Sequence, residues 1–98
     1  MEVKFDRNGS ELTVAVEGRV DTLTAPTLEE QVKGEINGVT KLVLDFTELK
    51  YISSAGLRVL LFLHQEMSQN GEMIVKNVCP EVMDVFDITG LSDALTIE

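Results

Sequence analysis

The segment from Lys41 to Ser68 constrains the fold of this chain more than any other. It opens with the run KLVLDF at 41–46, which is short, rich in β-formers and typical of a buried strand. After a predicted loop at 47–52, the sequence predicts a helix over 55–68. Apolar residues cover nearly every face of this helix: Leu57, Val59, Leu60, Leu61, Phe62 and Leu63. We therefore expect the helix to be well buried at its start and middle.

The remainder of the chain alternates strand and helix patterns. Asn8-Gly9 predicts a tight turn between two antiparallel strands, at 2–6 and 11–17. Thr24 is a candidate N-cap for a first helix, and Pro26 fits its first turn. The other expected elements are a turn at 18–21, an end of the first helix at 37–38, a strand at 73–75, a helix at 80–90 and a strand at 94–97. Alternating strands and helices predict an α/β fold with parallel pairing and at least one antiparallel hairpin.

Length and charge restrict what the chain can be. Its 98 residues fit a single domain over 1–98. Eight basic residues against seventeen acidic ones give a formal charge of -9, which disfavours nucleic acid and anionic membranes as partners. A protein partner would instead be expected to present a basic face. There is no signal-peptide segment at 1–8, and Cys79 is the only cysteine, so we expect a cytoplasmic protein without disulfides.

Catalytic and cofactor motifs are absent from the sequence. The only histidine, His64, follows Ser54 by ten residues on the same predicted helix, and no GxSxG elbow is present. Neither a P-loop nor a GxGxxG motif occurs, and the potential metal ligands are scattered. We expect no enzyme activity, no catalytic residue, no cofactor and no metal site. Asp45 is expected at a strand end, where it would accept loop N–H bonds.

Two adjacent serines, Ser53 and Ser54, stand at the predicted strand-to-helix junction. The role of Ser54 can be interpreted in two ways. In one, Ser54 is an ordinary N-cap that satisfies the N–H groups of Gly56 or Leu57. In the other, its hydroxyl is a modification site, because the free N–H groups and the dipole of a helix N-terminus favour a phosphate. The small residues Ala55 and Gly56 leave the approach to the hydroxyl uncrowded. The chemistry of these residues alone is compatible with both interpretations.

The segment YISSAGLRVLL resembles the serine loop of the STAS family of anti-sigma-factor antagonists. The family pattern there is an apolar pair, Asp, the phosphoacceptor Ser, a small residue, Gly and Leu. Ser54 falls on the phosphoacceptor, and Ser53 falls where the family usually has Asp. The segments EGRVDTLTAPTLEEQV and NGEMIVKNVCPEVMDVFDITGLSDAL extend the resemblance to nearly the whole chain. It implies a STAS fold with a small mixed sheet of about four to five strands and about three to four helices, packed mainly on one face.

The resemblance also implies a function. An unphosphorylated antagonist binds an anti-sigma factor that is a serine/threonine kinase, and phosphorylation of Ser54 releases it; a phosphatase restores the unmodified form. Ser53 is a rival acceptor. The surface implied to contact the kinase comprises Asp21, Thr22, Ser53, Ala55, Gly56, Leu57 and Arg58. The alternative is a STAS scaffold or accessory subunit, for instance of a transporter ATPase, in which Ser54 is never phosphorylated.

Overall fold

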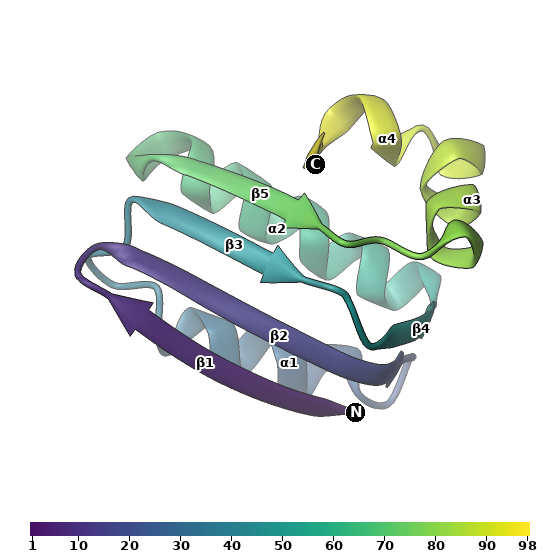
Figure 1. Ribbon diagram of the computed structural model, residues 1–98, viewed down its shortest axis with the longest axis horizontal. Coiled ribbons are helices and arrows are strands. Elements are labelled where there is room, and N and C mark those ends of the chain that lie inside the picture. Colours follow the sequence, from purple (N-terminus) through teal and green to yellow (C-terminus); the bar gives the residue numbers. More distant parts are fainter.

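The structure, a computed structural model, describes residues 1–98 as one six-stranded mixed sheet with four helices (Figure 1). The strands lie in the order β1-β2-β3-β5-β6, and β4 pairs with β2 beyond the end of β3. Only the β1–β2 pair is antiparallel. The predicted α/β class with a mixed sheet is therefore confirmed.

The N-terminal hairpin joins β1 (Glu2–Asn8) to β2 (Glu11–Val20). The turn forms where Asn8-Gly9 predicts it, and Gly9 adopts a φ of 66°, a conformation open to glycine without steric cost. Both strands are longer than predicted. The turn expected at 18–21 is wrong in its first part, because Gly18 takes a φ of 90° and the strand continues through an irregularity between Gly18 and Arg19.

The prolonged end of β2 pairs with β4 (Leu49–Ile52), a strand in a region where a loop was expected. This corrects the prediction for 47–52. The pairing is parallel and places Val20 opposite Ile52, so β2 and β4 end side by side. The other three strands are β3 (Lys41–Asp45), β5 (Glu72–Lys76) and β6 (Thr96–Ile97).

Two helices, α1 (Ala25–Lys33) and α2 (Ser54–Asn70), lie together across one face of the sheet (Figure 1). The other two, α3 (Pro80–Thr89) and α4 (Leu91–Ala94), pack beside β4 and β6. The end expected for the first helix at 37–38 is wrong: the helix ends at Lys33, and Ile36 reaches the core from the following turn. The short helix α4 had no counterpart in the sequence-based expectation.

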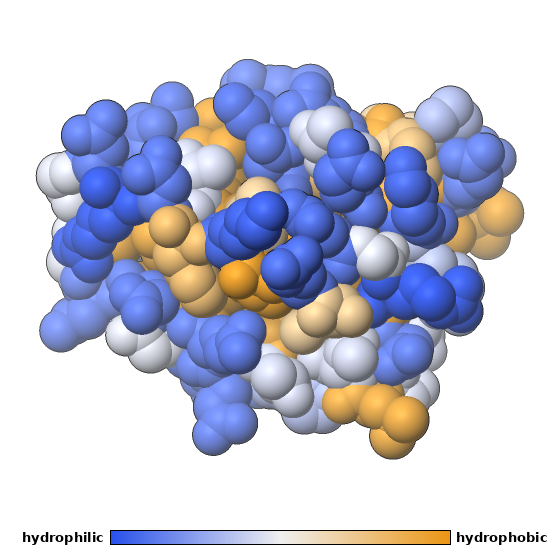
Figure 2. Space-filling view, turned by 60° about the horizontal axis from the view of Figure 1, so that its bottom comes forward, coloured by the Kyte–Doolittle hydropathy of each residue, from blue (hydrophilic) through white to orange (hydrophobic).

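The core is mostly aliphatic, with Phe46 and Phe86 as its buried aromatic residues, and lies between the helices and the sheet. It contains 24 apolar residues, and no polar or charged residue of the chain is buried. The helix α2 is buried along much of its length, as expected, through Gly56, Leu57, Val59, Leu60, Leu63 and Met67. Figure 2 shows one face of the molecule, on which apolar side chains are scattered among hydrophilic ones. No helix of the structure has the length and hydrophobicity that a membrane span requires.

Candidate functional site

Ser53 forms the junction between β4 and α2. Its backbone N–H donates to the carbonyl of Val20 at 2.8 Å, which holds Ser53 in an extended conformation next to the end of β2. Its hydroxyl accepts a hydrogen bond from the N–H of Gly56 at 3.4 Å, and its carbonyl accepts from the N–H of Leu57 at 3.0 Å. Ser53 is thus the N-cap of α2, and the reading of Ser54 as the cap is wrong by one residue. The bond to Val20 explains this, because it fixes Ser53 outside helical geometry.

Ser54 is the first residue of α2 and is exposed. Its hydroxyl makes no hydrogen bond within the chain, whereas that of Ser53 is occupied by capping. The first turn of α2 carries no acidic residue, so no carboxylate offsets the partial positive charge of the helix N-terminus. A negatively charged group on Ser54 would therefore be favoured electrostatically.

Gly56 lets the start of α2 approach the sheet closely. A Cβ atom at this position would lie 2.6 Å from Cγ1 of Ile52 and 2.8 Å from Cγ1 of Val20. These two residues are the paired ends of β4 and β2. Gly56 is therefore buried against the sheet, and its small size serves packing rather than access to the serine from solvent.

A tight turn before α1 lies beside this junction. The carboxylate of Asp21 accepts hydrogen bonds from the N–H groups of Leu23 and Thr24, both at 3.0 Å, and from the Thr24 hydroxyl at 3.1 Å. The bond from the Thr24 N–H is the main reason that the pKa of Asp21 lies below its ordinary value. Thr24 occupies the N-cap position of α1, as predicted, but its side chain caps no helix N–H and instead accepts from the N–H of Asp21 at 2.8 Å.

The structure brings the sequence-predicted contact residues to one end of the molecule, because Val20 connects the Asp21 turn to Ser53. They differ in exposure. Thr22, Ser54 and Arg58 are exposed; Asp21, Ser53 and Ala55 are half-buried; and Gly56 and Leu57 are buried. The exposed residues could meet a partner directly, while the buried pair fixes the position of the helix.

Three further residues at this end, Arg19, Leu23 and Tyr51, were not among the predicted contact residues. Arg19 places its guanidinium 4.2 Å from the centroid of the Tyr51 ring, across the β2–β4 pair. Leu23, in the turn before α1, is 86% exposed. Arg19 precedes the apolar residue Val20, and Tyr51 precedes the apolar residue Ile52. Had 49–52 been predicted as a strand, this alternation would have indicated that Arg19 and Tyr51 lie on the exposed face of the sheet.

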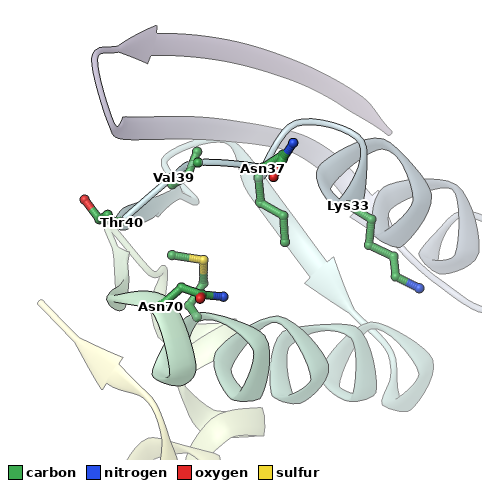
Figure 3. A pocket seen from close by; sticks show the side chains of 8 residues that line it. Lys33, Asn37, Val39, Thr40 and Asn70 are labelled. Atoms are coloured by element: carbon green, nitrogen blue, oxygen red, sulfur yellow. The ribbon is translucent and has the colours of Figure 1, made fainter.

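The larger of two hollows in the structure lies at the other end of α2 (Figure 3). It has a volume of about 550 Å³ and is formed by the end of α1, the loop that follows, and the end of α2. Its lining residues are Lys33, Ile36, Asn37, Gly38, Val39, Thr40, Met67 and Asn70. It contains none of the predicted site residues, since Ser54 is the first residue of α2 and Asn70 the last.

The sequence profile of the STAS domain matches residues 2–98. The chain belongs to the STAS domain family. The anti-sigma-B factor antagonist of Listeria monocytogenes is 29% identical over 100 residues, which cover 100% of this chain and 87% of that protein. BtrV of Bordetella bronchiseptica, described as a candidate anti-sigma factor antagonist, is 35% identical over 92 residues, which cover 92% of this chain and 79% of BtrV.

Solved structures of anti-sigma factor antagonists share the fold. An anti-sigma factor antagonist from Mycobacterium paratuberculosis superposes with a TM-score of 0.88 at 22% identity, covering 98% of this chain and 83% of that one. The unphosphorylated form of the anti-sigma factor antagonist SpoIIAA gives a TM-score of 0.84 at 20% identity, covering 99% of this chain and 88% of that one. The family and fold that the serine loop suggested are thereby confirmed.

Proposed function

We propose that this STAS protein is an anti-sigma factor antagonist that is switched by phosphorylation of Ser54. In its unphosphorylated form it binds an anti-sigma factor that is also a serine/threonine kinase, and phosphorylation releases it. The observation that carries the proposal is the free, exposed hydroxyl of Ser54 on the first residue of α2. Relatives named as anti-sigma-B factor antagonists support it, as does the existence of SpoIIAA in a phosphorylated form.

The physical basis of the switch is a change of charge without refolding. A phosphate adds roughly -1.5 to -2 charges at neutral pH. In the free protein, the N-terminus of α2 accommodates this charge because its N–H groups and dipole favour anions. In a complex that covers Ser54, the same charge would lose its water and meet a surface shaped for a neutral hydroxyl. Phosphorylation therefore weakens the complex more than it perturbs the fold.

The proposed partner surface comprises the exposed residues Thr22, Ser54 and Arg58 and the turn formed by Asp21. With a net charge of -9, the chain suits a partner with a basic face. A phosphatase would return Ser54 to the hydroxyl form. In this function the protein acts by binding, in the cytoplasm, and the kinase supplies the ATP site.

The partner kinase is first sought among the proteins that the unphosphorylated chain captures. Calorimetric titration of the purified kinase with this protein then tests the proposal. We expect Ser54→Ala to bind about as tightly as the wild type. Protein with phosphoserine at position 54 should bind at least about 100-fold more weakly, because a charge that is buried at an interface without a partner costs several kcal/mol. Ser53→Ala is the matched control, and it should still bind and still be released when Ser54 is phosphorylated.

Equal affinity of the phosphorylated and unmodified forms would contradict the switch. A protein that functions normally in cells as Ser54→Ala, with no kinase among its partners, would instead support a scaffold or accessory-subunit role, for instance on a transporter ATPase.

A further inference from the structure

Arg58 is the one cation on the first two turns of α2, and it lies four residues after Ser54. Residues four apart on a helix are neighbours on one face, with Cβ atoms roughly 5–6 Å apart. Both side chains are exposed. Arg58 takes part in none of the chain's three ion pairs, in neither of its cation–π contacts and in no side-chain hydrogen bond. Its guanidinium is thus available to a group on Ser54.

The cations on the two paired strands that lead to the junction, β2 and β4, are engaged elsewhere. Arg19 lies over the ring of Tyr51, and Lys50 lies 3.9 Å from the carboxylate of Glu48. The nearby carboxylate of Asp21 is turned into its own hydrogen-bonded turn. Arg58 is therefore the cation that a phosphate on Ser54 can recruit without breaking an existing contact.

We propose that Arg58 pairs with the phosphate of phosphorylated Ser54 along the surface of α2 and holds it against the helix. This inference rests on the proposed phosphorylation of Ser54. An anion one turn N-terminal to a cation is the favourable order on a helix. The planar guanidinium can donate two parallel hydrogen bonds to phosphate oxygens, a geometry that lysine cannot reproduce.

The pairing distinguishes the two serines. Ser53 lies five residues before Arg58, outside the three- and four-residue spacings that share a helix face. Its hydroxyl is also committed to the N–H of Gly56. A phosphate on Ser53 would therefore not meet Arg58 in the same way, so the position of Arg58 matches Ser54 as the acceptor.

The pair changes the partner-facing surface at two positions at once. Before phosphorylation, this surface offers a neutral hydroxyl at Ser54 and a free guanidinium at Arg58. After phosphorylation it carries a dianion, and the guanidinium is drawn onto that dianion. A kinase contact that uses Arg58 would then be lost together with any contact to the Ser54 hydroxyl.

Phosphorus-31 NMR titration tests the pair in full-length protein with genetically encoded phosphoserine at position 54. We expect the second phosphate pKa of this protein to lie roughly 0.3 pH units below that of its Arg58→Gln variant, the size expected for a helix pair at this spacing. Arg58→Lys should give an intermediate value, and the difference should shrink in 0.5 M salt to about half or less. The ¹⁵N signal of Arg58 Nε should shift on phosphorylation.

Phosphoserine encoded at position 53 is the matched control, and there Arg58→Gln should leave the phosphate pKa unchanged. Equal pKa values at position 54 with and without Arg58, with no shift of the Arg58 signal, would overturn the pair. Because the phosphate is installed without a kinase, that result would leave Ser54 phosphorylation itself intact. Conversely, absence of phosphate at Ser54 in cells would overturn the proposed function. The NMR titration would still decide whether Arg58 pairs with a phosphate at position 54.

Discussion

The side-chain amide of Asn77 donates a hydrogen bond to Oδ1 of Asp45 at 3.0 Å, although the two residues lie 32 positions apart in the sequence. The same oxygen accepts from the hydroxyl of Thr47 at 2.6 Å and from its N–H at 3.1 Å. Asp45 thus joins the end of β3 to the loop after β5 and fixes the start of the connection to β4. The sequence-based expectation that Asp45 accepts loop N–H bonds at a strand end is confirmed.

This cluster makes stability depend on pH. Hydrogen bonds from the Thr47 hydroxyl and then from Asn77 hold the pKa of Asp45 below its ordinary value. A carboxylate with a depressed folded-state pKa contributes stability above its unfolded pKa of about 3.9, and that contribution disappears as the pH falls through the folded value. At pH 6 we expect Asp45→Asn to lower the free energy of unfolding by about 1 kcal/mol. At pH 3 the difference in free energy of unfolding between the variant and the wild type should be smaller.

Urea unfolding at the two pH values measures this. The exposed residue Asp6, which makes no side-chain hydrogen bond, provides the control, and Asp6→Asn should show a small difference at both pH values. If the difference in free energy of unfolding between Asp45→Asn and wild type stays constant from pH 6 to pH 3, the ionised carboxylate is not the source of that difference.

Asn77 contributes a backbone conformation as well as a hydrogen bond. It is the one non-glycine residue with positive φ, at 62°. Both Asn77→Gly and Asn77→Ala should lose the bond to Asp45, and Asn77→Ala should add roughly 1 kcal/mol of backbone strain. We expect this strain to exceed the entropy that glycine adds to the unfolded chain, so the alanine variant should be the less stable. Thermal unfolding of the two variants compares them directly. Equal melting temperatures would mean that the loop relaxes its backbone at no cost.

Gly56→Ala tests how closely α2 must approach the sheet. Alanine is the better helix former by about 1 kcal/mol, so without a clash the substitution would stabilise the protein. Because the new Cβ would lie 2.6 Å from Cγ1 of Ile52, we expect a net destabilisation of about 1–3 kcal/mol. The double variant with Ile52→Ala should lose less than the sum of the single losses. Additive losses, or a stabilised Gly56→Ala protein, would contradict this packing.

The two serines should differ in their effects on stability. Ser53→Ala removes the N-cap of α2 and should cost about 0.5–1 kcal/mol, at the low end of measured caps because its bond to Gly56 is long at 3.4 Å. Ser54→Ala, at the exposed first helical position, should change the free energy of unfolding by less than about 0.5 kcal/mol. Chemical denaturation of the pair checks the assignment. A larger loss of stability for Ser54→Ala than for Ser53→Ala would indicate that Ser54 is the N-cap of α2.

The sequence predicted the hairpin, the buried strand and helix around residues 41–68, and the location of the serine junction, because these follow from local periodicity and turn chemistry. It did not predict β4, since LKYI does not alternate cleanly and pairs only with the part of β2 that continues past Gly18. The cap was misplaced by one residue because a long-range bond from Ser53 to Val20 decides it. The first helix was predicted too long because Ile36 keeps the apolar spacing while packing from a turn.

Site-localised mass spectrometry of the protein purified from cells that express it natively determines whether Ser54 is phosphorylated. We expect a phosphate on Ser54 that disappears in Ser54→Ala and persists in Ser53→Ala. Absence of phosphate across several growth conditions, or a phosphate confined to Ser53, would contradict this expectation and leave Ser54 as an unmodified first residue of α2.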